Sequence, residues 1–181
     1  MIDPSTRSRV GDISLEAHPE SFQIDPGTSQ IFVNVPEARG IAVVDRASQK
    51  QIGKWSLADR GANFPMVLDH VHRQVLVIFR TPAELGVFSM IDGKPIAPIE
   101  TCGDADDLFI DAKRARVYIS CGAGFLDVLE AKEASYRRIA RIPTVSGART
   151  SLFVPEMDRL LVAVRASSGE PAAIWIFRPI P

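Results

Sequence analysis

A repeat of about 43 residues is the feature of this chain that most restricts its fold. A short apolar run, a polar turn and a longer apolar run occur together four times in the 181 residues. The polar residue that opens the longer run lies at positions 30, 74, 116 and 159, at steps of 44, 42 and 43 residues. Because the steps differ by only one or two residues, each repeat is one structural unit, and insertions and deletions are confined to loops.

Each repeat also carries further short runs of β-branched and aromatic residues, bounded by Gly, Pro or polar turns, which are typical of strands. About four short strands per repeat is the pattern of a β-propeller blade. We therefore predict an all-β fold, a propeller of about four four-stranded antiparallel blades. The expected organisation is a disordered segment over 1–8 and a single domain over 9–181, with repeats near 16–57, 58–100, 101–143 and 144–181.

One segment gives conflicting signals. Residues 126–140 are rich in Leu, Glu, Ala, Lys and Arg, which favour a helix by intrinsic propensity. The repeat places a strand, a loop and a strand there instead. We predict strands, because tertiary context overrides propensity, with at most a short helical turn at 131–135.

The repeat resembles a known family. An apolar pair followed by Asp, as in Met66-Val-Leu-Asp69, a turn, an apolar strand, the run Val43-Val44-Asp45 and a basic-apolar outer strand are similar to the YVTN-type β-propeller repeats of bacterial surface and periplasmic proteins. The resemblance covers residues 9–178. It implies a propeller fold and little about function, since the shared residues are structural. Members of that family usually have seven blades and commonly carry a secretion signal.

The ends of the chain leave two interpretations open. Residues 9–15 are similar to residues 51–57, so the chain begins with an outer, fourth strand, whereas it ends just after a third strand. Residues 9–15 can complete the fourth blade and close a four-bladed ring, which would hide the sheet edges. Alternatively, the chain is the C-terminal part of a larger, seven-bladed propeller. In that case open blade edges favour self-association.

Composition limits the classes of partner. The chain has 21 Lys and Arg against 22 Asp and Glu, a formal charge of −1, which argues against nucleic acid as a partner. No apolar run is long enough for a membrane span, and the N-terminus has no apolar signal core. The expected location is the cytoplasm for the chain as written, and the periplasm or exterior if the chain is truncated at its N-terminus.

Candidate binding residues gather at one face of the predicted propeller. The first strand of each blade begins, and the second ends, at the face where loops surround the central channel, and function on this fold usually lies there. The repeat brings a set of polar residues of both charges to this channel face. They are His18, Glu20, Asn34, Asn63, Arg80, Asp104, Asp106, Asp107, Arg149 and Arg165.

The acidic cluster can be read in two ways. Asp104 and Asp106, with Asp107, concentrate carboxylates that suit Ca²⁺ or another divalent cation. They can equally cap turns by accepting backbone N–H groups, the interpretation that we favour. The arginines can form a fork for a carboxylate or phosphate, or ion pairs with this cluster, and we favour the ion pairs. No cofactor is expected apart from such a cation.

Cys102 and Cys121 begin the first strand and end the second strand of one blade. A disulfide between them and two free buried thiols are both open. A uniform strand register places Cys121 opposite Asp106, which would hold the two Cα atoms too far apart for a bridge.

These observations favour a non-enzymatic scaffold that presents a polar channel face to a small ligand or a partner protein. One alternative is a divalent-metal-dependent lactone hydrolase, because propeller lactonases resemble this architecture. The other is a truncated fragment of a larger propeller without a function of its own.

Overall fold

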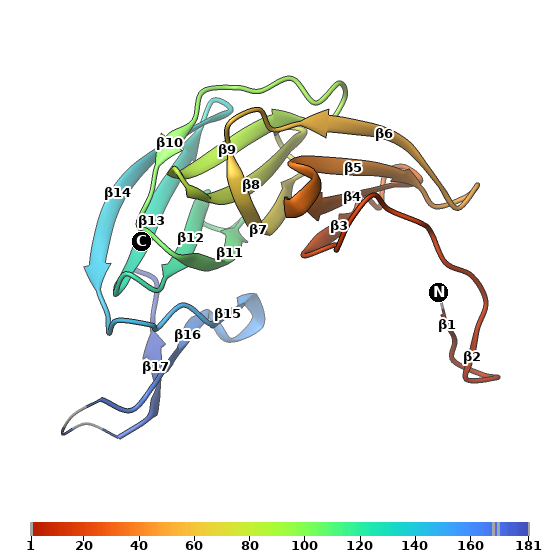
Figure 1. Ribbon diagram of the computed structural model, residues 1–181. Helices are drawn as coiled ribbons and strands as arrows, with labels where there is room; N and C mark the ends of the chain where they lie inside the picture. Colours follow the sequence, from red (N-terminus) through yellow and green to blue (C-terminus); the bar gives the residue numbers. More distant parts are fainter. Residues whose placement is uncertain (1, 168, 170, 181) are drawn as a thin grey trace.

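The computed structural model describes residues 2–167, 169 and 171–180. It confirms the all-β class and the propeller arrangement: four antiparallel sheets follow one another around an arc (Figure 1). The first three sheets have four strands and the last has three. Blade 1 contains β3 (Phe22–Ile24), β4 (Gln30–Val35), β5 (Gly40–Asp45) and β6 (Lys50–Ser56), with a 3-10 turn at Pro36–Ala38.

The other blades repeat this meander, with each strand paired to the next along the chain. Blade 2 is β7 (Gly61–Asp69), β8 (Gln74–Thr81), β9 (Ala83–Ser89) and the short β10 (Ile99–Glu100). Blade 3 is β11 (Ala105–Asp111), β12 (Arg116–Cys121), β13 (Phe125–Lys132) and β14 (Ser135–Pro143). Blade 4 is β15 (Ser151–Val154), β16 (Arg159–Val164) and β17 (Ala173–Phe177), with a 3-10 turn at Pro155–Met157.

The hydrophobic core lies between successive blades. The second strands of blades 2 and 3 are covered on both faces, as their apolar side chains require; Val75, Leu76, Val77 and Ile78 of β8 are all fully buried. One face of β8 joins the cluster shared with blade 1, and the other joins the cluster shared with blade 3. A third cluster holds blade 4 against blade 3.

One set of polar contacts between blades lies on the face opposite the channel-face loops. In blades 1 and 2 the Asp that ends the first strand accepts an N–H group of its own turn and also bonds a neighbouring blade; in blade 3 Asp111 bonds Arg114 of its own turn, and that arginine reaches Asp158 of blade 4. The inter-blade pairs are Asp25 with Arg73, at 3.4 Å, Asp69 with the hydroxyl of Tyr136, at 2.6 Å, and Asp158 with Arg114, at 2.7 Å. Burial alone would raise the pKa of Asp69, but hydrogen bonds from His72 and Tyr136 hold it below its ordinary value.

The segment with conflicting signals is β-structured. Residues 125–132 and 135–143 form strands β13 and β14 and pair in antiparallel register. Glu133 and Ala134, which join the two strands, both have left-handed backbone with φ of 50° and 62°, as two-residue hairpin turns require. The prediction from the repeat is confirmed because the apolar side chains of β13 are buried between blades.

The ends do not close a four-bladed ring. Within the described residues β17 pairs with β16 alone, and residues 9–15 lie at the far end of the arc, beside blade 1 (Figure 1). Over the stretch predicted as disordered, Ile2–Asp3 (β1) pairs with Ser8–Arg9 (β2), while residue 1 is outside the described part. The closed four-bladed arrangement is therefore not the one that this chain adopts.

No helix among the described residues is long and apolar enough to cross a membrane.

Candidate functional site

The candidate site is formed by loops. They precede the first strand of each blade and follow the second. Antiparallel pairing brings these two strand ends together in every blade. In blade 2 the pair Asn63 and Phe79 marks this end, and in blade 3 it is Ala105 and Cys121. Side chains from several blades therefore meet at one face.

The centre of this face is a network of four charges from three successive regions of the chain. Arg80, at the end of β8, pairs with Asp104 at 3.2 Å and with Asp106. Arg149, just before β15, pairs with the other oxygens of the same carboxylates, at 2.5 Å for Asp104 and 2.8 Å for Asp106. The favoured prediction, ion pairs between these arginines and the acidic cluster, agrees with this geometry. The hydrogen bond with Asp104 and the charges of Asp106 and Asp104 raise the pKa of Arg149.

The Arg80 side chain is held from three sides. Its guanidinium lies 4.5 Å from the centre of the Phe64 ring, at a distance typical of a cation–π contact. Its Nε donates to the backbone carbonyl of Ala105 at 3.1 Å. With the two carboxylates as additional partners, the group has little freedom and presents a fixed set of donors.

The loop that carries Asp104 is fixed by its backbone. Asp104 has left-handed backbone with φ of 59°, and its carbonyl accepts the N–H of Gly122 at 2.7 Å. A Cβ at position 122 would lie 2.0 Å from an oxygen of Asp104, so a glycine is needed where this side chain crosses the backbone. Gly122, directly after Cys121, therefore makes room for Asp104.

An open cleft of about 340 Å³ lies beside the network. Its walls come from the start of blades 1 and 2 and from the charged network itself. The lining residues are Glu20, Ser21, Phe64, Pro65, Arg80, Asp106 and Arg149. We refer to it below as the channel-face cleft.

Asn34 and Asn63 lie beneath this cleft and have a structural role there. Both are fully buried. Asn63 donates to the side-chain oxygen of Asn34 at 3.1 Å, and Asn34 donates to the Phe64 carbonyl at 3.0 Å. Ser21 also donates to that carbonyl. These bonds join blades 1 and 2 directly beneath Phe64.

The remaining predicted residues are less closely associated with the network. Asp107 is half-buried and accepts the backbone N–H of Ser151 in blade 4 at 2.5 Å; burial and the neighbouring Asp106 raise its pKa. His18 is exposed on the segment before blade 1, and the exposed Arg165 packs against Gly147. The structure thus brings together Glu20, Arg80, Asp106 and Arg149, with Asp104 behind them.

The donor set does not fit a divalent cation at Asp104 and Asp106. All four of their carboxylate oxygens contact a guanidinium group. Within the described part of the chain, no group of three or more His, Cys, Asp or Glu side chains is arranged to hold a metal ion. The guanidinium groups of Arg80 and Arg149 would repel a cation placed here, and they already contact the carboxylate oxygens that would bind it.

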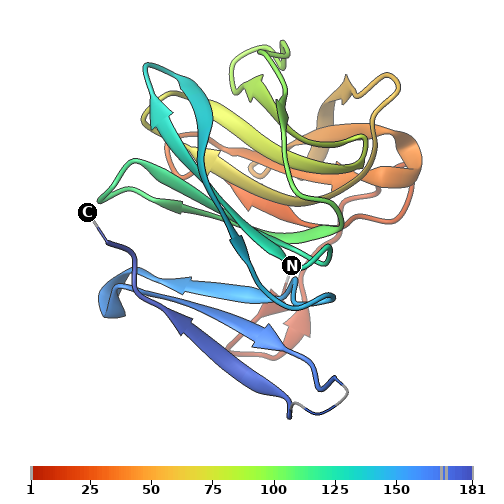
Figure 2. The same cartoon turned by 90° about the vertical axis from the view of Figure 1, so that its left-hand side faces the viewer.

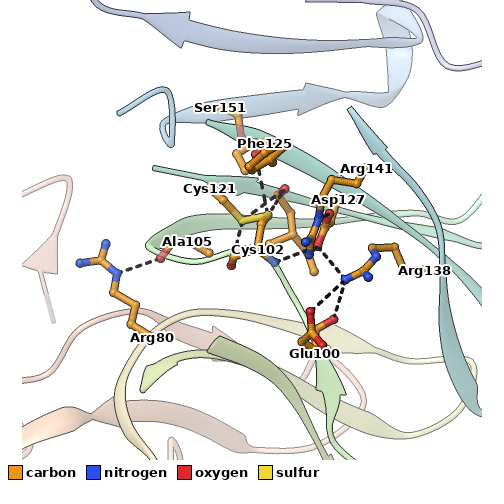
Figure 3. The surroundings of a disulfide bond; sticks show 12 residues. Arg80, Glu100, Cys102, Ala105, Cys121, Phe125, Asp127, Arg138, Arg141 and Ser151 are labelled. Carbon is orange, nitrogen blue, oxygen red and sulfur yellow. Dashed lines mark hydrogen bonds and ion pairs between the residues drawn. A yellow bond between two sulfur atoms is a disulfide. The ribbon is translucent and has the colours of Figure 1, made fainter. Parts of the chain in front are cut away.

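Cys102 and Cys121 form a disulfide with a Cα–Cα distance of 5.8 Å (Figure 3). The expected register was wrong by one residue: a bulge between Ala105 and Asp107 places Cys121 opposite Ala105 rather than Asp106. Both cysteines are buried. The bridge ties the start of the acidic loop to the end of β12.

A buried ion pair beside the disulfide was not found from the sequence. Asp127 is fully buried, accepts the N–H of Cys102 at 2.8 Å, and receives two hydrogen bonds from Arg141, at 2.7 and 2.8 Å (Figure 3). The sequence signal for this buried pair was an Asp within the otherwise apolar third strand. Ser21 was also missed, although the repeat places it 43 residues before Phe64.

Comparison with known proteins supports the fold. The chain has a TM-score of 0.75 to Kuenenia stuttgartiensis hydrazine synthase, at 16% identity, covering 88% of this chain and 46% of that one. A candidate 6-phosphogluconolactonase from Bacteroides uniformis gives 0.70 at 18% identity, covering 82% and 48%. A chain of the mitotic checkpoint complex gives 0.65 at 11% identity, covering 83% and 46%.

These solved structures are β-propeller proteins, and the chain spans about half of their length. At such identities the similarity establishes the fold alone and does not single out the YVTN repeat family. No family model matches the sequence, and no curated protein matches it.

Proposed function

We propose that this chain is a non-enzymatic binding module whose channel-face cleft holds a small, uncharged polar ligand, one rich in hydroxyl or amide groups. The observation that carries this proposal is the four-charge network of Arg80, Arg149, Asp104 and Asp106 at the wall of the cleft. Two positive and two negative groups cancel, so the wall offers hydrogen bonds without a net charge.

The network retains capacity for a ligand. A guanidinium has five N–H donors and a carboxylate oxygen can accept more than one hydrogen bond. The hydrogen bond of Arg80 to Ala105 and the four ion pairs leave donors of Arg149 and further acceptor positions on Asp106 available. About two fifths of the Arg149 side chain is exposed. A free anion is less well matched, because it would compete with Asp104 and Asp106 for the same guanidinium groups.

The alternative of a metal-dependent lactone hydrolase has less support. It would need a cation held by the acidic cluster, and the guanidinium groups already take those oxygens. The likeness to a candidate 6-phosphogluconolactonase bears on the fold only.

A ligand panel tests the proposal. Isothermal titration would compare sugars and polyols with amino acids, dicarboxylates and inorganic phosphate. We expect an uncharged polar compound to bind and Arg149→Gln to weaken that binding about tenfold, the effect of losing one charge-assisted hydrogen bond. Arg137→Gln is the matched control, since Arg137 is an exposed arginine on β14 paired with Glu130.

Three results would contradict the proposal: binding confined to anions, equal affinities of the two arginine variants, or turnover of a lactone substrate that Asp106→Asn abolishes.

A further inference from the structure

The carboxylate of Asp104 lies between two guanidinium groups. It is 3.2 Å from Arg80 and 2.5 Å from Arg149, and each arginine contacts a different oxygen. Arg80 belongs to blade 2, whereas Asp104 and Arg149 directly precede blades 3 and 4, and these blades follow one another around the arc (Figure 2). Two guanidinium groups that converge on one pair of oxygens are an arrangement that binds phosphate or carboxylate ions. Asp104 therefore fills a position suited to a small oxyanion.

Asp104 is held less firmly by its strand than the other acid of the network. Asp106 lies within β11, whereas Asp104 precedes that strand. The backbone of Asp104 is left-handed, with φ of 59°, which is unfavourable for a residue with a Cβ atom. Two hydrogen bonds fix the loop: Gly122 donates to the Asp104 carbonyl at 2.7 Å, and Ala123 donates to the Gly103 carbonyl at 3.1 Å. If these two bonds open, Asp104 can leave the arginines while Asp106 stays.

The disulfide ties this loop at its base. Cys102 lies two residues before Asp104, and Cys121 directly precedes Gly122 (Figure 3). A covalent tie restricts the open states of the segment that it closes. Without the tie the loop can open locally while the strands around it stay folded. The N–H of Cys102 would still be held by its hydrogen bond to the buried Asp127, at 2.8 Å, so the opening is confined to the residues after Cys102.

Other blades keep the same strand pairing without a bridge. The positions of blade 2 that correspond to Cys102 and Cys121 lie 42 residues earlier and are Arg60 and Phe79. Their contact is non-covalent, with the guanidinium 5.8 Å from the centre of the ring. In blade 4 the corresponding positions are occupied by two valines, at 145 and 164, which pack in the cluster shared with blade 3. The bridge is thus dispensable for the fold of a blade, and it stands where its loss frees Asp104.

We propose that Arg80 and Arg149 form a latent site for a small oxyanion, a phosphate or a carboxylate, which Asp104 blocks while the disulfide is intact. A dithiol opens the site. One thiolate of the dithiol attacks the sulfur of Cys102 and breaks the S–S bond, and its second thiolate then displaces Cys102 from the mixed disulfide. The dithiol ends as a disulfide, and both cysteines end as thiols after the transfer of two electrons and two protons. Asp104 then leaves, and the oxyanion takes the place of its carboxylate.

This inference rests on the proposed function of the channel-face cleft, because Arg80, Arg149 and Asp106 also line that cleft. With Asp104 in place, two positive and two negative groups cancel and the wall suits an uncharged ligand. With Asp104 displaced, two positive groups face one negative group, and the wall attracts anions. The redox state of the bridge therefore selects the class of ligand.

Removing the blocking side chain tests the latent site without a redox change. Glycine adopts left-handed backbone readily, so Asp104→Gly vacates the site and keeps the loop and the disulfide. In isothermal titration this variant should bind inorganic phosphate or succinate about tenfold more tightly than the wild-type chain, the effect of one charge-assisted hydrogen bond. Comparison of the two anions shows whether the site takes a phosphate or a carboxylate.

Glu130→Gln is the matched control, because it removes one negative charge from an exposed residue paired with Arg137 and should leave anion binding unchanged. Arg149→Gln, added to Asp104→Gly, should abolish the gain. Equal anion affinities of Asp104→Gly and Glu130→Gln, or a gain that persists without Arg149, would refute the latent site.

The control by the disulfide is tested on the wild-type chain with dithiothreitol. The reduced chain should bind the same anion about tenfold more tightly than the oxidised chain, and reoxidation should reverse the change. Cys102→Ala with Cys121→Ala should match the reduced chain in the absence of reductant. Hydrogen exchange should become faster at the amides of Gly122 and Ala123, while the amides of β8 keep their protection.

The outcomes separate the redox control from the proposed function. A bridge that resists the reductant in the folded chain, unchanged exchange at 122–123, or faster exchange over every strand would overturn the redox control. Loss of the far-ultraviolet circular dichroism on reduction would overturn it as well. A chain that binds no uncharged compound, yet shows the expected gains for the anion, would instead contradict the proposed function and support the latent site.

Discussion

Replacing Asp127 by Asn would remove the charge of the most buried carboxylate beside the disulfide. Asp127 has no exposed surface, and it accepts two hydrogen bonds from Arg141 and one from the backbone of Cys102. Asn has nearly the same shape but only one acceptor oxygen. Its amide nitrogen would face a guanidinium donor, and Arg141 would lose its counter-charge.

The magnitude follows from the exposure of the two partners. Breaking a buried ion pair by removing one charge costs about 3 to 5 kcal/mol. The Arg141 side chain is about a third exposed, so water recovers part of its solvation and we expect about 3 kcal/mol. For a chain of this length that corresponds to a decrease in Tm of roughly 6 to 12 °C.

Urea unfolding followed by circular dichroism would measure the loss as a lower midpoint at unchanged m value. The matched control is Glu130→Gln, which removes the exposed partner of Arg137 on the same hairpin and should change stability by less than about 0.5 kcal/mol. If Asp127→Asn costs no more than Glu130→Gln, the buried pair does not stabilise blade 3 and the reasoning is refuted.

Three further predictions concern the core, pH and the disulfide. Phe153→Ala, in the cluster between blades 3 and 4, should cost about 3 to 5 kcal/mol in urea unfolding, whereas Val71→Ala at an 83% exposed turn position should be nearly neutral. Hydrogen bonds from Arg114 lower the pKa of Asp158 from 3.8 to about 2. The resulting stabilisation is complete above the ordinary pKa of Asp and is lost as pH falls towards 2. The Tm measured in thermal melts should therefore fall less steeply with decreasing pH in Asp158→Asn than in the wild-type chain. Reducing the disulfide, which spans a sequence separation of 19, should cost about 3 kcal/mol, and an unchanged melt after verified reduction would contradict this.

The sequence by itself determined the class of fold and the number of repeated units. Strand patterns are local, because alternation, β-branched runs and turn residues lie within a few positions of one another. The same pattern recurs at corresponding positions in the four repeats. For this reason the helix-prone residues 126–140 were correctly predicted as strands. The repeat also located the channel face, where Arg80, Arg149, Asp104 and Asp106 meet.

Only the tertiary structure decided which of several chemically equal partners each group takes. A single bulge near Asp106 shifted the register and allowed the disulfide, and the carboxylates of Asp104 and Asp106 entered an ion-pair network with Arg80 and Arg149. Whether residues 9–15 can reach blade 4 likewise depends on the curvature summed over all blades; Ile13 and Leu15 pack instead against blade 1. These outcomes rest on contacts between residues far apart in the chain, whose geometry no local pattern contains.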